Sequence, residues 1–100
     1  MKVVWTYEAE QSFNSIIDYL LARWTSKEAN AFVDLVTEII EHIQSFPEMY
    51  KISEYDNQSR EALITKHTTM FYRILERTIE IEYFWGNLQD PQRLKDILEK

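Results

Sequence analysis

Apolar residues recur every three or four positions in the first half of the chain and alternate with polar ones in the second half. Val3, Val4 and Trp5 come first, and this β-branched and aromatic run predicts a short edge or inner strand. Thr6 follows as a candidate N-cap, with Glu8 in the first helical turn, where the helix dipole favours acids. An apolar helical face then continues to about residue 24, formed by Ala9, Phe13, Ile16, Ile17, Leu20, Leu21 and Trp24.

A second helix is predicted directly after the first. Thr25 and Glu28 form a capping box, in which each side chain binds a free backbone N–H of the new helix. Pro47 ends the helix. Its apolar face consists of Ala29, Phe32, Val33, Val36, Ile39, Ile40, Ile43 and Phe46. The turn between the two helices is so short that they must be antiparallel, and the apolar stripes of this hairpin need a surface to cover them.

Three strands over residues 60–66, 69–75 and 78–85 are predicted to supply that surface. Their short connections require antiparallel neighbours. The third strand alternates most cleanly, which predicts Ile79, Ile81, Tyr83 and Trp85 on one face and Glu80, Glu82 and Phe84 on the other. Asp90 and Pro91 then predict the start of a terminal helix, whose apolar edge consists of Leu94, Ile97 and Leu98.

The predicted fold class is therefore α/β (α+β), in the order β-α-α-β-β-β-α, with a helical hairpin packed on a small antiparallel sheet. The chain has 100 residues, of which 45% are hydrophobic and 28% charged. This composition is that of one globular domain spanning residues 1–100, with no room for a second core.

The charge balance narrows the possible partners. The net charge is -6, and the first 50 residues carry three basic side chains against eight acidic ones, whereas the last 50 carry eight against nine. An acidic body of this kind argues against free nucleic acid as a partner. The chain has no cysteine, which suits a reducing compartment. No apolar run has the length of a signal core or a membrane span, so we expect a cytoplasmic protein with no membrane partner.

Cofactor chemistry is not expected either. The two histidines lie far apart in the sequence without metal-ligand spacing, so no metal site is predicted. Gly86 is the only glycine, and a glycine-rich phosphate loop therefore cannot be built. We set aside dependence on ATP or NAD.

The candidate chemistry lies on the predicted strands. Arg60, Lys66, His67 and Arg73 occur there among several aromatic residues, which indicates a surface that meets an anionic or aromatic target. An ordinary structural role competes with this interpretation, since the two arginines can form ion pairs worth roughly 0.2–1 kcal/mol with acids on neighbouring strands. The acids in question are Glu61, Glu76, Glu80 and Glu82. A histidine in a turn is more often an exposed polar residue than a catalyst, and a neighbouring lysine is more often solvated.

A set of short motifs, taken in order, resembles the RelE/ParE superfamily of bacterial type II toxins over essentially the whole chain. The motifs are Trp5-Thr6, Phe46-Pro47, Arg60, Lys66-His67, Phe71-Tyr72-Arg73-Ile74 and Phe84-Trp85-x-Asn87-x-Gln89-Asp90-Pro91. The resemblance implies a small α/β fold, a cognate antitoxin protein as partner and a target whose inhibition stops growth.

The resemblance implies one of two activities. RelE-like members cleave messenger RNA on the ribosome, which requires a base, an acid and cations for the phosphate. Arg60 and Arg73 match phosphate-stabilising positions of such nucleases, and Lys66 or His67 would move a proton. ParE-like members block DNA gyrase and need no acid–base pair.

The end of the last strand separates the two activities. Nucleases of the superfamily usually add a histidine, lysine or tyrosine there, whereas this chain has Trp85, Gly86 and Asn87. We therefore expect a gyrase-blocking toxin. The alternatives are a ribosome-dependent endoribonuclease and a non-toxic relative that retains only antitoxin binding.

Overall fold

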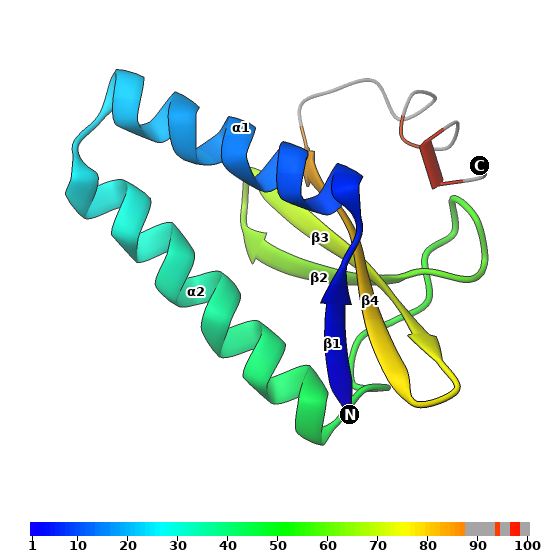
Figure 1. Cartoon of the computed structure of the whole chain (residues 1–100). Helices are drawn as coiled ribbons and strands as arrows, with labels where there is room; N and C mark the ends of the chain where they lie inside the picture. Colours follow the sequence, from blue (N-terminus) through cyan, green and yellow to red (C-terminus); the bar gives the residue numbers. More distant parts are fainter. Residues whose placement is uncertain (88–93, 95–96, 99–100) are drawn as a thin grey trace.

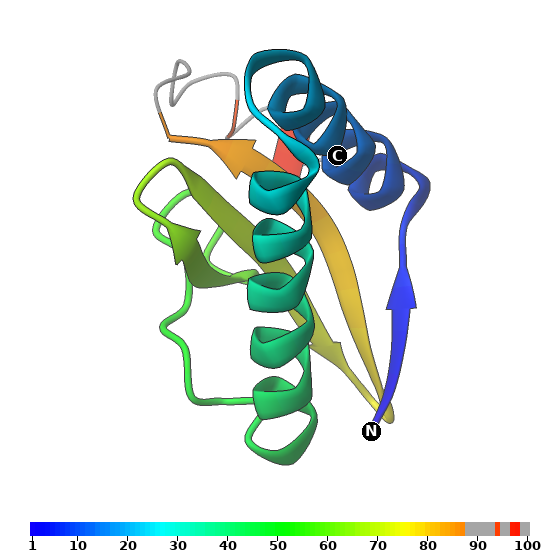
Figure 2. The ribbon, with the colours of Figure 1, turned by 90° about the vertical axis from the view of Figure 1, so that its left-hand side faces the viewer.

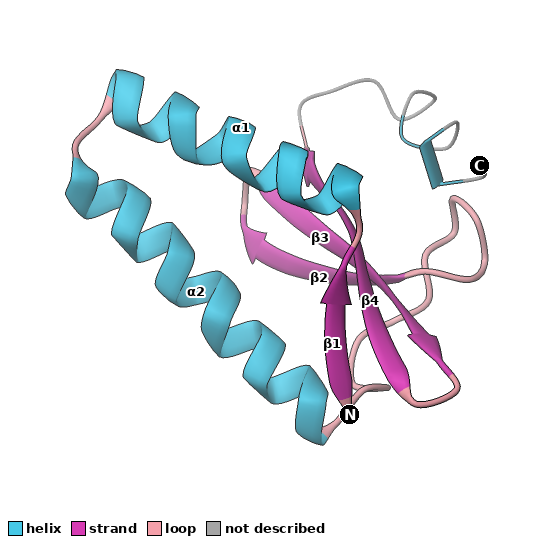
Figure 3. Ribbon diagram, in the orientation of Figure 1, coloured by secondary structure: helices cyan, strands magenta, loops and turns pink. Residues whose placement is uncertain are grey.

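The computed structural model describes residues 1–87, 94 and 97–98, and its elements follow the predicted order (Figures 1 and 3). They are β1 (Lys2–Trp5), α1 (Tyr7–Arg23), α2 (Ser26–Ser45), β2 (Arg60–Thr65), β3 (Thr68–Leu75) and β4 (Thr78–Gly86). The predicted order β-α-α-β-β-β is confirmed. The predicted start of a terminal helix at Asp90 and Pro91 lies outside the described residues, although Leu94, Ile97 and Leu98 are helical.

Both helices begin at the predicted caps. The Thr6 hydroxyl accepts a hydrogen bond from the Ala9 backbone N–H at 2.9 Å. At the second helix, the Thr25 backbone N–H donates to the Glu28 carboxylate at 2.9 Å, which completes the capping box. Hydrogen bonds from the Thr25 hydroxyl and the Thr25 backbone N–H to the Glu28 carboxylate lower the pKa of Glu28.

The sheet has the strand order β1-β4-β3-β2. The three strands joined by short turns are antiparallel, as predicted. The first strand differs, because β1 lies at an edge and pairs in parallel with β4, with Val4 opposite Glu80. The two helices carry the chain from β1 at one edge to β2 at the other, and β3 and β4 then bring it back beside β1. The connection between β1 and β4 is therefore long, as parallel pairing requires. The sheet is therefore mixed.

Both helices cover one face of the sheet, which we call the helix side (Figure 2). The core lies between the helices and the sheet, and it includes Phe32 and Val36 of α2 together with Met70, Tyr72 and Ile79 of the sheet. The opposite face, the outer face, carries a smaller cluster formed by Phe71, Trp85, Leu94 and Leu98. Among the described residues, no helix is both long enough and apolar enough to cross a membrane.

A β-bulge in β4 overturns part of the predicted alternation. Phe71 of β3 lies opposite Tyr83 and Tyr72 lies opposite Ile81, so Glu82 is an extra residue without a partner of its own. An inserted residue shifts the following side chains to the opposite faces. Ile79 and Ile81 lie on the helix side as one set, but Phe84 joins them there, while Tyr83 and Trp85 lie on the outer face.

The predicted apolar faces of the two helices also extend too far toward the helix C-termini. Trp24 is 62% exposed and Phe46 is 69% exposed, although the helical period assigns both to the apolar faces. Trp24 is the C-cap of α1, at the turn that joins the helices, and this turn projects beyond the edge of the sheet (Figure 1). Phe46 is the C-cap of α2, where the helical geometry that set its direction has ended.

Candidate functional site

Arg73 is the centre of the most connected polar cluster on the outer face. It lies on β3 directly opposite Glu80 of β4, and its side chain is 25% exposed. The guanidinium forms ion pairs with Glu82 at 2.7 Å and with Asp56 at 3.1 Å. It also donates hydrogen bonds to the Gln58 side chain, the Ser59 hydroxyl and the Leu98 carbonyl, at 2.7, 3.4 and 3.1 Å. One side chain therefore joins the loop before β2, the bulge in β4 and the described C-terminal residues.

The loop of residues 53–59 is shaped by its own polar side chains. The Asp56 carboxylate accepts hydrogen bonds from the backbone N–H groups of Gln58 and Ser59 at 3.1 and 3.0 Å. Asn57, at the tip, has a φ of 57°, a left-handed conformation that asparagine tolerates better than most residues. Asp56 is an Asx-turn residue whose side chain is only 3% exposed and is aimed at Arg73.

The bulge in β4 places Glu82 in this cluster. Because Glu82 is the inserted residue, its side chain points to the outer face together with that of Tyr83, and it reaches Arg73. Burial raises the pKa of Glu82, and this effect exceeds the opposing influence of the hydrogen bond from Ser59 and the charge of Arg73. Burial alone also raises the pKa of Asp56, but hydrogen bonds from Ser59 and Gln58, with the charge of Arg73, hold the pKa of Asp56 below its usual range.

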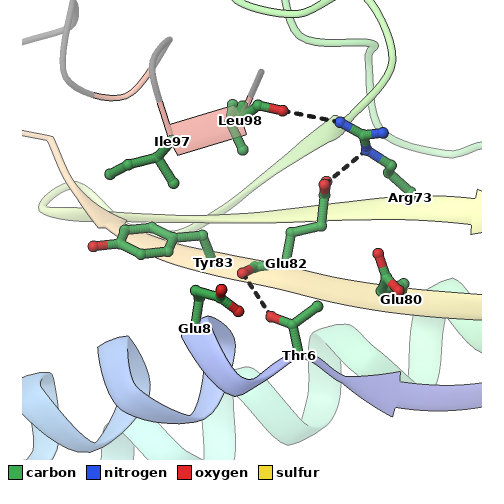
Figure 4. Close-up of a pocket in the computed structure, with 8 residues that line it drawn as sticks. All are labelled: Thr6, Glu8, Arg73, Glu80, Glu82, Tyr83, Ile97 and Leu98. Carbon is green, nitrogen blue, oxygen red and sulfur yellow. Dashed lines mark hydrogen bonds and ion pairs between the residues drawn. The ribbon is translucent and has the colours of Figure 1, made fainter. Parts of the chain in front are cut away.

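A cleft of about 180 Å³ lies beside this cluster (Figure 4). Its walls come from the start of α1, from β3 and β4, and from the described C-terminal residues. The polar wall consists of Glu8, Glu80, Glu82 and Arg73, and the apolar wall includes Tyr83 and Ile97. The rim is therefore acidic apart from one arginine, which is already paired with Asp56 and Glu82.

Arg60, the second candidate arginine, lies on the other face. It is opposite Tyr72, and directly paired residues share a face of a sheet. Its guanidinium donates to the backbone carbonyls of Tyr50 and Glu48 at 2.7 and 3.3 Å, so it holds the segment that follows α2. The Tyr72 hydroxyl donates to the Pro47 carbonyl at 2.7 Å, and burial raises the pKa of Tyr72 to about 12. None of the acids expected as partners of Arg60 pairs with it among the described residues.

Lys66 and His67 form the turn between β2 and β3, and both side chains are exposed. Their carbonyls are bound by Asn87, whose side-chain amide donates to Lys66 at 3.1 Å and whose backbone N–H donates to His67 at 2.8 Å. Asn87, at the end of the last strand, thus holds the turn between β2 and β3. His67 and Arg73 are six residues apart along an extended strand, a separation of about 20 Å.

The four residues singled out from the sequence thus occupy three places and do not converge on one point. Their assignment as catalytic residues of a nuclease stays a prediction. Sequence reasoning missed Asp56 and Ser59, which form the cluster with Arg73. A sequence signal was present in Asp56-Asn57-Gln58-Ser59, since such polar runs form turns whose side chains bind neighbouring backbone groups. Within the described residues, no group of three acids or histidines is placed to hold a metal ion.

Two comparisons with known proteins bear on the family and the fold. Residues 3–91 match the family described as "ParE toxin of type II toxin-antitoxin system, parDE". The fold is similar to a solved structure titled "Chromosomal ParDE TA system from P. aeruginosa", with a TM-score of 0.73 and 18% sequence identity. That match covers 86% of this chain and 95% of the other. No curated protein is significantly similar in sequence.

Proposed function

Because the chain belongs to the ParE toxin family of type II toxin–antitoxin systems, we propose that it stops growth by blocking DNA gyrase and that a cognate antitoxin protein neutralises it. The observation that carries this proposal is the state of Arg73. Its guanidinium is paired with Asp56 and Glu82, both largely buried, so its charge is already used within the fold.

A nuclease would need that charge for the reacting phosphate. A phosphate would have to displace two carboxylates that are 3% and 13% exposed, and each displaced carboxylate would remain buried without its partner. Breaking a buried pair in this way is costly, whereas transition-state stabilisation requires a cation that is free to approach the substrate. The paired state of Arg73 therefore favours a mechanism in which the toxin binds the surface of a target protein over one in which Arg73 binds a reacting phosphate.

The placement of the proton-transfer candidates supports the same conclusion. A general acid or base must come within about 3 Å of the proton that it moves. His67 and its neighbour Lys66 are about 20 Å along the strand from Arg73, and one scissile phosphate cannot span that separation. A ParE-like mechanism needs no such convergence.

The test compares two activities of the same protein, one with purified components and one in cells. DNA gyrase supercoiling is measured with increasing protein, and cellular messages are examined by primer extension after induced expression. We expect loss of supercoiling, intact messages and restored growth when the antitoxin is co-expressed. Cleaved messages with unaffected gyrase would favour the ribosome-dependent nuclease instead, with Arg60, Lys66, His67 and Arg73 as its site residues. Normal growth on induction would indicate the non-toxic relative.

A further inference from the structure

The Ser59 hydroxyl has more partners than its single hydrogen can serve. Ser59 is fully buried, and its Oγ lies 2.6 Å from Asp56 Oδ2 and within hydrogen-bond distance of Glu82 Oε1. Arg73 Nε donates to the same oxygen at 3.4 Å. Ionised carboxylates only accept hydrogen bonds, and a serine hydroxyl has one hydrogen to donate. If both acids were ionised, one of the two oxygen–oxygen contacts would therefore contain no hydrogen.

We propose that the chain Glu82–Ser59–Asp56 binds one additional proton in the folded protein, and that this proton holds the loop of residues 53–59 on the outer face of the sheet. The proton resides on Glu82 Oε1, which donates to Ser59 Oγ. The Ser59 hydroxyl then donates to Asp56, and the other oxygen of Glu82 still accepts from Arg73 at 2.7 Å. Every contact in the chain then contains a hydrogen.

The charges around Glu82 favour this arrangement. Arg73 of β3 is the only cation that faces it among the described residues, and it is shared with Asp56 of the loop. Glu80 of the same strand and Glu8 of α1 line the adjoining cleft together with the ionisable phenol of Tyr83. Burial, Asp56 and Glu80 all raise the pKa of Glu82, whereas Ser59 and Arg73 oppose the rise.

Asp56 differs from Glu82 in the number of groups that favour its charged form. It accepts from two backbone N–H groups, the Ser59 hydroxyl and Arg73, and these lower its pKa against the effect of burial. The two acids are thus driven in opposite directions. The first proton taken up by the cluster therefore belongs to Glu82.

The consequence is a loop whose docking depends on pH. Because the pKa of Glu82 is raised when the loop is docked, protonation favours the docked loop, and the advantage is lost as pH rises through that pKa. As pH rises from below the pKa of Glu82 in the open state to above its pKa in the docked state, the ratio of docked to open loop falls. The total fall is about tenfold for every unit by which the docked-state pKa exceeds the open-state pKa. Beyond this cluster, the loop contributes Tyr55, which is half-buried against the outer-face cluster.

The experiment measures the proton and the loop separately in the intact protein. Side-chain carboxyl shifts and backbone amide exchange are recorded by NMR from about pH 4 to about pH 8, at low protein concentration because the isoelectric point is near 4.9. We expect Glu82 to titrate above the ordinary glutamate range and Asp56 below the ordinary aspartate range. After correction for intrinsic exchange, protection of the 53–59 amides should fall as Glu82 loses its proton.

Matched variants test the chemistry. Glu82→Gln supplies a permanent N–H donor to Ser59 and an acceptor to Arg73, so loop protection should become independent of pH. Glu80→Gln, on the same strand but outside the chain, should keep the pH dependence. Ser59→Ala removes the bridge, so loop protection should follow the titration of Glu82 less steeply than in the parent protein.

Two results would overturn the proposal. The first is an ordinary titration of Glu82 in the parent protein, which does not depend on any variant folding. The second is equal pH dependence of loop protection in the parent and in Glu82→Gln. Neither result bears on gyrase inhibition, which is measured independently.

Discussion

The helix side of the sheet is held by an extensive apolar core, whereas the outer face combines a smaller apolar cluster with a few polar atoms that converge on one guanidinium. On the helix side, Phe84 packs between Trp5 and Phe13, with ring centroids 5.3 Å from each. On the outer face, Arg73 joins a loop, a strand and the described C-terminal residues through polar contacts. We infer that the apolar core supplies most of the stability of the fold, and that the Arg73 cluster holds three separate segments in place on the outer face.

Phe84→Ala should have the largest effect on stability. Phe84 is 2% exposed, and removing a buried phenylalanine lowers the free energy of unfolding by roughly 3–5 kcal/mol. Urea unfolding of the variant and the parent measures this difference. Tyr83→Ala is the matched control, because the bulge places Tyr83 on the half-exposed outer face. If Tyr83→Ala cost more than Phe84→Ala, the assignment of the two faces would be reversed.

Arg73→Met should cost less, roughly 1–3 kcal/mol near neutral pH, because it leaves Asp56 and Glu82 buried without their cation. Part of the loss should be recovered on acidification, as the carboxylates become neutral. Unfolding is measured at neutral and acidic pH. Equal losses at both pH values would show that packing of the arginine stem, and not its charge, matters.

Variants of Arg73 also distinguish a direct functional role of this residue from a purely structural one. As a scaffold, Arg73→Ala reduces growth inhibition only in proportion to the folded protein that is lost. In a nuclease it would reduce cleavage by on the order of 100-fold without changing the fold, and Arg73→Lys would not restore a bidentate grip. Melting temperature and growth inhibition are measured on each variant. We expect the scaffold pattern, and toxicity lost from a fully folded variant would contradict it.

Asp56→Asn and Glu82→Gln should change the pH dependence of stability in opposite senses. The lowered pKa of Asp56 gives stability that is present above the unfolded value, near 3.9, and is lost as pH falls through the folded pKa. Glu82 has a raised pKa, so its contribution is present at low pH and is lost as pH rises through the folded value. Asp56→Asn should therefore flatten the acid side of the stability curve, and Glu82→Gln should raise its neutral side relative to its acid side. Parallel curves for the two variants would contradict the opposed shifts.

The smallest change is expected for antitoxin binding as salt increases. The chain is acidic, so we expect the partner to bind through apolar surface or added backbone pairing rather than through charge. The dissociation constant should change by less than about threefold between low and physiological ionic strength. Titration calorimetry at two salt concentrations measures it. A steep loss of affinity would indicate a charged interface.

The parts of the fold that could be predicted from the sequence are those set by periodic spacing of apolar residues or by neighbouring residues in the chain. Ala9 and Phe32 fall on apolar faces at helical spacing, and the caps at Thr6 and Thr25 precede each helix directly. The bulge could not be predicted, because Glu82 fits strict alternation as a polar residue and only its partner strand shows that it is inserted. Parallel pairing of β1 was equally hidden, since it depends on the edge of the sheet to which the helices carry the chain.

The candidate site was predictable only in part. Arg73 was identified, and its pairing with Glu82 was among the structural alternatives. Asp56 was missed because its partner is 17 positions away, and no local pattern reports a contact between a loop and a strand of that separation. A polar cluster depends on the direction of individual side chains, which periodicity does not encode. The sequence therefore indicates the strand that carries the chemistry more readily than the atoms that surround it.

The pairing of β1 with β4 also bears on how the protein is made. Thr6, at the end of β1, donates a hydrogen bond to the Glu82 carbonyl across 76 positions. During synthesis, Val3, Val4 and Trp5 emerge long before their partner strand β4, since both helices and two other strands are translated in between. Non-local pairing of this kind is slow to form and leaves apolar strand residues open to aggregation. We therefore expect β1 to dock last, and a nascent chain to acquire its complete sheet only after β4 has been translated.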